Sequence, residues 1–261
     1  MINSSYFNHV DRIIKDGLPA APRGLAVREL FDVDFSFSSC NVPRRRGLNL
    51  ALGFMEMCQL IGGVFDREAI AAVAPKAQLD LFSGQSAYGP RVRDQIPPVI
   101  QELVDDPSSR RATLIIANQR EVDAANTPCT LTYQFHLRDK VLNASVFMRS
   151  SDAIWGLPYD VVQFGGLLQA VASAIVVRPG WITIHIGNAH VYDSTMHLRP
   201  TIEESSWERA TMFTLPAAAG ADPLTRWYHA REWALEFVRN DHGAWDTGVP
   251  LGMGVMSWPR R

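Results

Sequence analysis

The sequence predicts an α+β fold in which a mixed β-sheet packs against long buried helices. Short β-rich runs bounded by turn residues follow one another in the second half of the chain. Two apolar segments have the length and all-round hydrophobicity of buried helices. The 261 residues are 47% hydrophobic and 20% charged, and no linker or repeat divides them, so we expect one domain over residues 1–261.

Four segments have helical patterns: 48–61, 92–104, 161–177 and 224–238. The first is apolar on every side except at Glu56, and it ends at the glycine pair Gly62-Gly63. The second is interrupted by Pro97-Pro98. The third carries small and apolar residues throughout, which predicts a buried helix.

Four β-rich runs follow the second of these helices: 112–117, 131–137, 141–148 and 181–186. The middle two are separated by only a few residues, which suits a hairpin. A buried helix lies between the third and fourth runs, so the strands are expected to form a mixed sheet with helices on it.

Composition excludes several classes of function. A net charge of -2 gives no bulk attraction to nucleic acid or to acidic membranes. The three cysteines lie far apart with no CxxC pair, which argues against a disulfide framework and a metal site. The N-terminus is polar, and no apolar run approaches the roughly 18 residues of a membrane span. We therefore expect a cytoplasmic protein without metal or membrane.

Cys129 is the first candidate for chemistry. A lone cysteine among apolar residues is more often inert packing than a nucleophile. However, Arg149 follows the next predicted strand, and a hairpin would return it to Cys129. A guanidinium near a thiol favours the reactive thiolate, so the sequence leaves the inert and the nucleophilic interpretations both open.

Other candidates also have two interpretations. Glu56 lies within an apolar helix, where a buried carboxylate is costly unless it is paired or functional. His190 and Tyr192 alternate on a predicted strand, as a purely structural pair also does. Arg110-Arg111 follows Asp105-Asp106 and could form a surface salt-bridge cluster.

Taken together, these segments resemble the thymidylate synthase family. Its Pro-Cys-His-x-x-x-Gln-Phe segment corresponds to Pro128 through Phe135, and its Arg-Ser-x-Asp element to Arg149 through Asp152. Gly-Leu-Pro-Phe-Asn becomes Gly156 through Asp160, and Gly-Asp-Ala-His-x-Tyr becomes Gly187 through Tyr192. Upstream, Arg110-Arg111 resembles the family's arginine pair, Tyr88-Gly89 its Tyr-Gly turn, and Glu56 lies in the helix that carries its glutamate. The motifs span about residues 50 to 195.

The resemblance implies the family's fold and a role for each matching residue. Cys129 would add to C6 of a pyrimidine nucleotide, Glu56 would organise water and proton transfer, and Tyr88 would assist proton removal from C5. The implied substrate-binding residues are Arg23, Arg110, Arg111, Gln134, Arg149, Ser150, Asp160, His190 and Tyr192. Among them, Arg110 and Arg111 would reach the partner's phosphate site in a homodimer. Asp152 and Gly156 would contact the co-substrate 5,10-methylenetetrahydrofolate.

Asp160 stands where the family carries an asparagine that reads uracil. Cytosine presents an N3 acceptor beside a 4-amino donor, and a carboxyl group can accept from that amino group and, if protonated, donate to N3. Asp160 could instead cap a helix that begins at Val161, although asparagine caps equally well. The exchange therefore points to cytosine.

Four departures from the family pattern suit capture of water, and hence a hydroxymethyl product, over hydride transfer. They are an unrelated closing tail at 256–261, no tryptophan in 79–83, Thr130 in place of histidine, and Met148 in place of glutamine. The resemblance thus implies a folate-dependent cytidylate 5-hydroxymethylase acting on dCMP or CMP, in phage DNA modification or in nucleoside-antibiotic synthesis. Either context implies a bacterial cytoplasmic protein, or a phage protein in its host's cytoplasm.

The alternatives are a divergent thymidylate synthase or dCMP methylase and, from another class, a non-catalytic relative that binds nucleotide or RNA. Binding alone needs no thiol, which disfavours the last. A cysteine hydrolase is disfavoured because His190 has no recognisable orienting partner in the sequence.

Overall fold

The structure is a computed structural model, and it describes residues 2–74, 76, 79, 82–118, 127–203, 206–209, 213 and 222–240. The helices and turns of 3-10 type are α1 (Ile2–Asp16), η1 (Pro22–Gly24), α2 (Leu50–Gly62), α3 (Arg67–Val73), α4 (Gly89–Val92), α5 (Ile96–Asp105), α6 (Gly156–Ala174), η4 (Asp193–Leu198), α7 (Arg199–Glu203) and α8 (Pro223–Asn240). The strands are β1 (Leu18–Ala20), β2 (Val27–Ser38), β3 (Asn41–Arg44), β4 (Thr113–Ile115), β5 (Thr130–Arg138), β6 (Val141–Met148), β7 (Ser151–Asp152), β8 (Arg178–Tyr192) and β9 (Ser206–Arg209).

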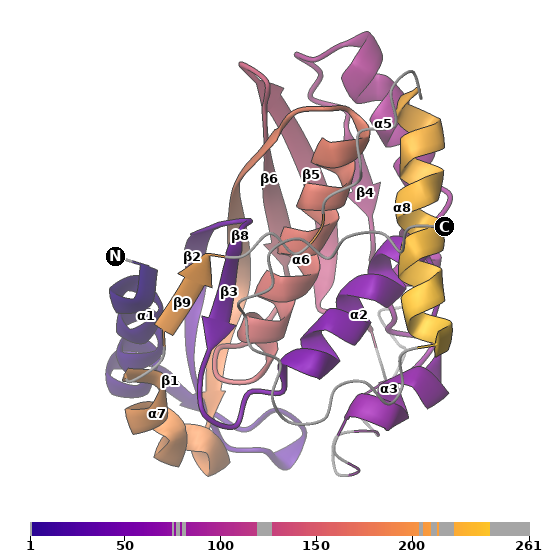
Figure 1. Cartoon of the computed structure of the whole chain (residues 1–261). Coiled ribbons are helices and arrows are strands. Elements are labelled where there is room, and N and C mark those ends of the chain that lie inside the picture. The colour runs from indigo at the N-terminus through magenta and orange to yellow at the C-terminus, as the bar shows by residue number, and fades with distance from the viewer. Residues whose placement is uncertain are drawn as a thin grey trace.

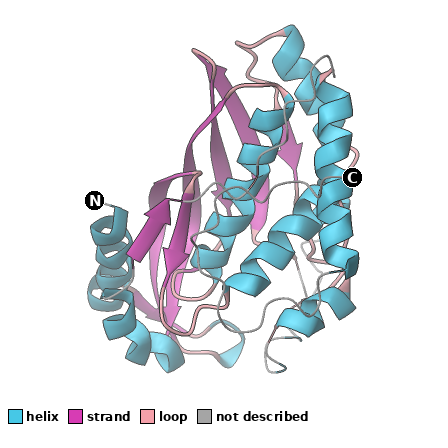
Figure 2. Cartoon of the chain, viewed as in Figure 1, coloured by secondary structure: helices cyan, strands magenta, loops and turns pink. Residues whose placement is uncertain are grey.

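Seven strands form one mixed sheet, which confirms the predicted α+β class. Its order is β1-β2-β8-β6-β5-β4, with β7 pairing at the end of β8. β6 and β7 run parallel to β8, and the other pairs in this sheet are antiparallel. β3 and β9 form a separate small sheet. Helices α6, α2 and α8 lie together over one face of the main sheet, and α1 and α7 lie beyond its β1–β2 side (Figures 1 and 2).

The hairpin of β5 and β6 returns the chain to its own beginning. Its turn is Asp139-Lys140, both in the left-handed region with φ of 50° and 57°, as a tight two-residue hairpin requires. The register runs from Arg138 opposite Val141 to Thr130 opposite Met148. The residues just before β5 and just after β6 therefore become neighbours, as the sequence predicted.

Helices α2 and α6 approach each other closely. A Cβ atom on Gly166 of α6 would fall within the space of the Met57 side chain of α2, and one on Gly53 of α2 would lie 3.3 Å from Cδ1 of Tyr159. Such contacts between helices bring the backbones near each other and fix the relative placement of side chains on them. α2 ends at Gly63 with φ of 70°, which confirms the predicted glycine stop.

The predicted helix over 161–177 is wrong at its start. α6 begins at Gly156, because Oδ1 of Asp152 accepts hydrogen bonds from the backbone N–H groups of Ile154 (2.8 Å) and Trp155 (3.3 Å) and turns the chain into the helix. Pro158 falls in the first turn, where its missing N–H is harmless. Asp160 therefore lies inside the helix, and it does not cap a helix that begins at Val161.

The prolines of 92–104 mark a second correction. The chain breaks into α4 and α5, and Pro97-Pro98 lie in the first turn of α5 instead of interrupting one helix. α8 confirms the helix predicted over 224–238 with slightly wider bounds. Residues 256–261, and Asp80 and Leu81 within 79–83, lie outside the described part of the chain, so one domain over 1–261 stays a prediction.

No helix or strand was predicted for the first 45 residues, which form α1, β1, η1, β2 and β3. β2 carries alternating buried residues Val33, Phe35 and Phe37, and α1 buries Tyr6 and Val10 one turn apart. Both periodicities are visible in the sequence. Within the described residues, the helices fall short of the length and apolarity that crossing a membrane would need.

Candidate active site

Cys129 and Arg149 meet at the open end of the β5–β6 hairpin. Nη2 of Arg149 lies 3.8 Å from the Sγ atom of Cys129, and the hydroxyl of Ser150 lies 3.8 Å from the same sulfur. The backbone N–H of Arg149 also donates to the carbonyl of Cys129 at 2.9 Å. Cys129 is a free, half-buried thiol, so a guanidinium and a hydroxyl face an accessible sulfur.

The guanidinium of Arg149 is held by backbone carbonyls. Nε donates to the carbonyl of Pro128 at 3.0 Å, and Nη2 donates to that of Thr127 at 2.9 Å. These bonds use the two residues that precede Cys129 and leave the side chain largely exposed. A positive charge fixed beside a thiol stabilises the thiolate, and an exposed guanidinium suits phosphate oxygens.

His190 and Tyr192 lie at the end of β8, beside β7. Their rings form an edge-to-face contact with centroids 5.1 Å apart, and Asp152 is the ladder partner of His190. Burial lowers the pKa of His190, an effect that the charge of Asp152 opposes. Burial raises the pKa of Tyr192, and the charge of Cys129 raises it further while Arg23 opposes both. The His-Tyr pair therefore lies within electrostatic reach of the thiol.

Arg23 lies in the exposed turn η1, in the left-handed region with φ of 53°. Its positive charge opposes the rise in the pKa of Tyr192. The role of Arg23 at the phosphate stays a prediction.

A half-buried carboxyl on α2, Glu56, and a buried carboxyl on α6, Asp160, interact electrostatically. The pKa of Glu56 is raised to about 8, first by burial and then by the negative charge of Asp160. The pKa of Asp160 is also raised to about 8, by burial and then by the charge of Asp152. Asp160 is 7% exposed. In the free protein both carboxyls are therefore largely protonated at neutral pH.

Tyr88 connects these carboxyls to the thiol. Its ring stacks on Phe164 of α6 with centroids 6.3 Å apart. Burial raises its pKa well above the ordinary value, and the charges of Asp160 and Cys129 add to that rise. Tyr88 is thus a neutral hydroxyl whose pKa responds to both the α6 carboxyl and the nucleophile candidate.

Several buried polar atoms around this pocket have no hydrogen-bond partner within the described part of the chain. They include Oε2 of Glu56, Oγ of Ser151, and Nη1 and Nη2 of Arg45. Leaving such groups unpaired costs about 1–3 kcal/mol each, so they mark where a ligand or ordered water would bind. Arg45 lies over the ring of Trp155, 4.9 Å from its centroid.

Arg45 is the site residue that sequence reasoning missed, since 44–46 read as solvated surface. The unpartnered guanidinium and its aromatic neighbour are properties of packing, which an arginine run in a sequence does not reveal. Gly156 lies next to Asp152, where a Cβ atom would be 3.6 Å from that of the aspartate.

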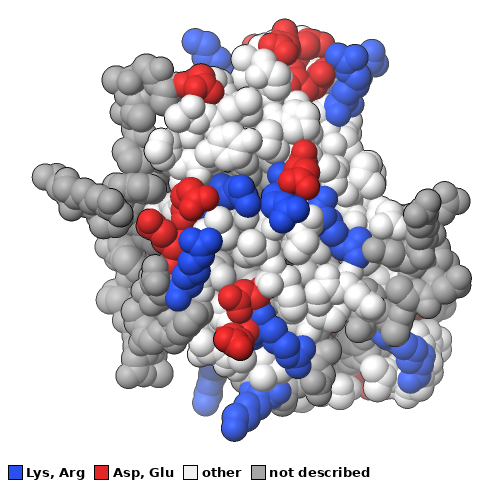
Figure 3. All heavy atoms as spheres, turned by 90° about the vertical axis from the view of Figure 1, so that its right-hand side faces the viewer, with Lys and Arg blue, Asp and Glu red and all other residues white. Residues whose placement is uncertain are grey.

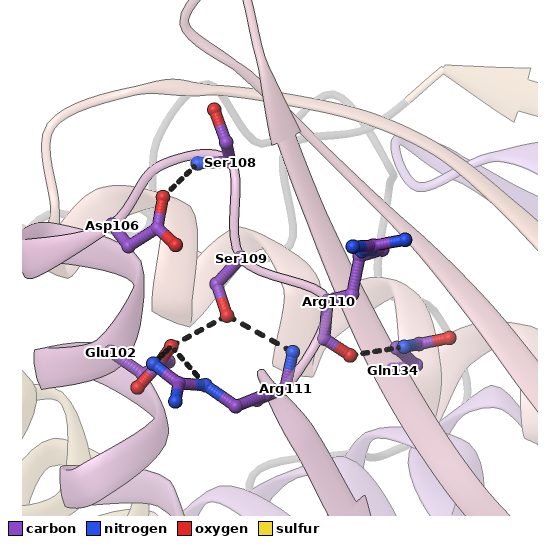
Figure 4. A network of polar contacts seen from close by, with 7 residues as sticks. All are labelled: Glu102, Asp106, Ser108, Ser109, Arg110, Arg111 and Gln134. Atoms are coloured by element: carbon purple, nitrogen blue, oxygen red, sulfur yellow. Dashed lines mark hydrogen bonds and ion pairs between the residues drawn. The ribbon is translucent and has the colours of Figure 1, made fainter.

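The structure places three predicted substrate residues in a separate network (Figure 4). Nε and Nη2 of Arg111 donate to Oε1 of Glu102 at 3.0 and 2.8 Å, and Ser109 donates to the same oxygen at 2.5 Å. The side-chain amide of Gln134 donates to the carbonyl of Arg110 at 2.8 Å. The salt-bridge cluster thus uses Glu102 instead of the expected acidic pair at 105–106.

The Arg110 side chain points away from this network (Figure 4). Arg111 is exposed as well, and neither arginine contacts the Cys129 site within the chain through a described bond. The face of the molecule that Figure 3 presents carries acidic and basic side chains interspersed.

Contacts and electrostatic interactions connect Cys129 with Arg149, Ser150, Tyr88 and Tyr192, and connect Asp152 with His190 and Asp160. The functional roles of these residues, and of Arg23, Glu56 and Gly156, stay predictions. The described residues thus form an α+β protein in which an arginine contacts a half-buried cysteine.

Comparison with known proteins identifies the family. A family model described as thymidylate synthase matches residues 72–216, which is more than half of the chain. The chain therefore belongs to the thymidylate synthase family.

Individual relatives match over shorter stretches. Thymidylate synthase of Mycoplasma genitalium is 31% identical over 102 residues, which cover 39% of this chain and 36% of that protein. Thymidylate synthase of Mycoplasma pneumoniae is 33% identical over 102 residues, with the same coverage of 39% and 36%. Thymidylate synthase of Staphylococcus haemolyticus is 26% identical over 121 residues, 46% of this chain and 38% of that protein. The matches span little more than a third of these relatives' length.

Proposed function

We propose that this protein is a folate-dependent cytidylate 5-hydroxymethylase that converts dCMP or CMP to its 5-hydroxymethyl derivative. One observation carries the proposal. Asp160 is a buried carboxyl inside α6, with no capping function, and its charge acts together with that of Cys129 on Tyr88. The family pattern has asparagine at this position, so the acid calls for a functional reason.

The pyrimidine ring would be activated by Cys129. Its thiolate, favoured by the Arg149 guanidinium at 3.8 Å, would add to C6 and make C5 nucleophilic. Arg149 and Ser150 would hold the 5′-phosphate, with the exposed Arg23 closing over it, and His190 and Tyr192 would bind the sugar hydroxyl. After carbon transfer, loss of the C5 proton and departure of tetrahydrofolate would leave an exocyclic methylene on C5. Water would add to this methylene, and release of the thiol from C6 would restore the aromatic ring.

Recognition of cytosine by a carboxyl needs one shared proton. The 4-amino group donates to one oxygen of Asp160, and a proton lies between the other oxygen and N3. With a pKa raised to about 8, Asp160 carries this proton at neutral pH. A protonated carboxyl also matches the N3–H and O4 of uracil, which is the reason to keep a divergent thymidylate synthase or methylase as the second candidate.

Proton transfer around the base would fall to Glu56 and Tyr88. Oε2 of Glu56 is buried without a partner, so it suits a water molecule that delivers the hydroxyl of the product. Thr130 and Met148, which stand where the family has histidine and glutamine, are ladder partners beneath this region. A methionine provides no hydrogen bond there, and the water would be ordered by the carboxyl.

The residues present fit a folate co-substrate, which supplies the one-carbon unit when bound. Asp152 and Gly156 lie at the start of α6, and Arg45 presents an unpartnered guanidinium over the Trp155 ring nearby. An aromatic surface beside an unpaired cation suits a planar ring system that carries carboxylates.

A homodimer would complete the phosphate site. Arg110 and Arg111 are exposed, and in a dimer they would reach the partner's nucleotide. The strands also present large exposed apolar side chains: Leu131 (37%), Phe147 (41%) and Trp181 (53%). Phe147 stacks on His185 at 4.7 Å, which gives this face an ordered aromatic surface for a second copy.

The test is direct. The purified protein is incubated with 5,10-methylenetetrahydrofolate and, separately, dCMP, CMP or dUMP, and the nucleotide is analysed by mass spectrometry. A gain of CH2O on a cytidylate supports the proposal. A gain of CH2 on dUMP supports the second candidate, and absence of any product together with tight nucleotide binding supports a non-catalytic relative.

A further inference from the structure

Tyr159 connects the two helices that carry the buried carboxyls. It immediately precedes Asp160 in α6, and its hydroxyl oxygen accepts a hydrogen bond from the backbone N–H of Asn49 at 3.1 Å. Asn49 is the N-cap of α2, the helix of Glu56. The family pattern has phenylalanine at this position, which carries no hydroxyl to accept such a bond.

The side chain of Asn49 makes two further hydrogen bonds. Its Oδ1 accepts from the backbone N–H of Leu52 at 3.2 Å, which caps α2, and its Nδ2 donates to the carbonyl of Val73 at the end of α3 at 2.6 Å. The Tyr159 hydroxyl therefore attaches α6 to a cap already fixed by two bonds. Of these bonds, the one to the Tyr159 hydroxyl joins the cap to α6, so movement of the cap along α6 would break it.

The Tyr159 ring also fills the space over Gly53. A Cβ atom at Gly53 would lie 3.3 Å from Cδ1 of Tyr159. Tyr159 is 9% exposed. Its hydroxyl contacts Asn49 and its ring contacts Gly53, so Tyr159 touches α2 at two positions. Glu56 lies one turn after Gly53 on the same helix. Two contacts on one rigid helix fix both its distance from α6 and its rotation.

We propose that Tyr159 is a positioning residue for Glu56: its hydroxyl holds the start of α2 so that Glu56 faces Asp160 and the base. This inference rests on the proposed function for its catalytic consequence and on the Asn49 contact for its structural part. The groups that face Glu56 are Asp160 from the same helix as Tyr159, Tyr88 and Tyr159 itself.

The test replaces Tyr159→Phe, which removes the hydroxyl and keeps the ring. Loss of the bond lets α2 shift, and a displacement of about 1 Å can cost up to about 100-fold in rate. We expect kcat to fall about tenfold while KM for the nucleotide changes less than about twofold, because the phosphate site at the hairpin end is untouched.

Tyr133→Phe is the matched control. Tyr133 is also a buried tyrosine whose hydroxyl bonds to α6, donating to the carbonyl of Phe164 at 3.1 Å, but its hydrogen bond does not involve α2. Both variants lose one buried hydrogen bond and should lose similar thermal stability. A merely structural role for Tyr159 would make the two variants kinetically alike.

A readout independent of turnover separates this inference from the proposed function. The carboxyl of Glu56 is followed by carbon-13 NMR against pH, with Glu56→Gln to assign the signal. The midpoint should fall in Tyr159→Phe, since Glu56 moves away from Asp160 and into more water, and stay unchanged in Tyr133→Phe. An unchanged midpoint in Tyr159→Phe would overturn the inference. If no nucleotide is turned over, the proposed function fails and the titration still decides this point.

Discussion

The Sγ atom of Cys129 and the Nη2 atom of Arg149 lie 3.8 Å apart because the tight turn of one hairpin returns the chain along itself. The arginine is held at this distance by the carbonyls of the residues just before the cysteine. Thiol and guanidinium are thus placed by the same short segment, without help from distant parts of the fold. The reactivity of the thiol should depend on this one contact.

Arg149→Gln should slow alkylation of Cys129 by iodoacetamide by about tenfold at neutral pH, because the nearby positive charge is lost. The rate is measured by mass spectrometry of the modified peptide. Arg138→Gln is the control, since Arg138 lies on the same hairpin but bonds to the carbonyls of Pro107 and Ser108. Equal rates in the two variants would contradict activation by Arg149.

Asp160→Asn should reverse the choice of base. Loss of the shared proton leaves an amide that pairs with uracil, and a mismatched polar pair in a buried site costs on the order of 100-fold in kcat/KM. The ratio of kcat/KM for dCMP to that for dUMP is the measurement. Asp222→Asn, at an exposed aspartate beside the start of α8, is the control and should leave the ratio unchanged. A preference for dUMP in the unaltered protein would refute the assignment.

The stability of the protein should fall as pH rises from about 5 to about 8. The pKa of Glu56 is about 8 in the folded protein against 4.5 ordinarily, so below 4.5 both the folded and unfolded states hold the proton. Between these values the unfolded state ionises first and is favoured, and above 8 the loss is complete. Glu56→Gln removes the part of this dependence that comes from Glu56, leaves the part that comes from Asp160, and should raise Tm by roughly 5 °C at pH 8.

Thermal denaturation at a series of pH values checks this expectation, with Glu68→Gln at the exposed start of α3 as the control. The difference between Glu56→Gln and the unaltered protein should vanish near pH 4. A constant difference across the range would mean that Glu56 is not the titrating group.

Two inactive variants should restore each other's activity if the partner's arginines complete the site. Cys129→Ser lacks the nucleophile, and a double variant of Arg110→Ala and Arg111→Ala lacks the donated cations. Mixing them after reversible dissociation gives about half heterodimers, each with one intact site of two, hence about one quarter of full activity. Activity is assayed by product mass. No recovery, with heterodimers verified by native mass spectrometry, would argue against shared sites.

The parts of the site that sequence could predict are those fixed by local chain geometry. The hairpin follows from two adjoining β-rich runs, and the return of Arg149 to Cys129 follows from the hairpin. The start of α6 could not be predicted in the same way, because the hydrogen bonds of Asp152 to the following N–H groups begin the helix ahead of its apolar stretch. A periodicity argument sees only the apolar stretch.

Longer-range features were out of reach for a different reason. The unpaired Arg45 and the Glu102 partner of Arg111 depend on which surfaces the fold brings together. By contrast, the alternating buried residues of β2 are a local pattern that the sequence does contain. The buried pair of carboxyls depends on the close approach of α2 and α6 at Gly53 and Gly166, which no local pattern encodes.

The early start of α6 has a consequence for how such an enzyme could change its preference. Asp160 projects from the body of a helix, not from a loop, so its backbone is fixed by bonds on both sides. Aspartate and asparagine have nearly the same shape, and their codons differ by a single nucleotide. A point mutation at this position could therefore redirect the choice of pyrimidine without disturbing the packing around it.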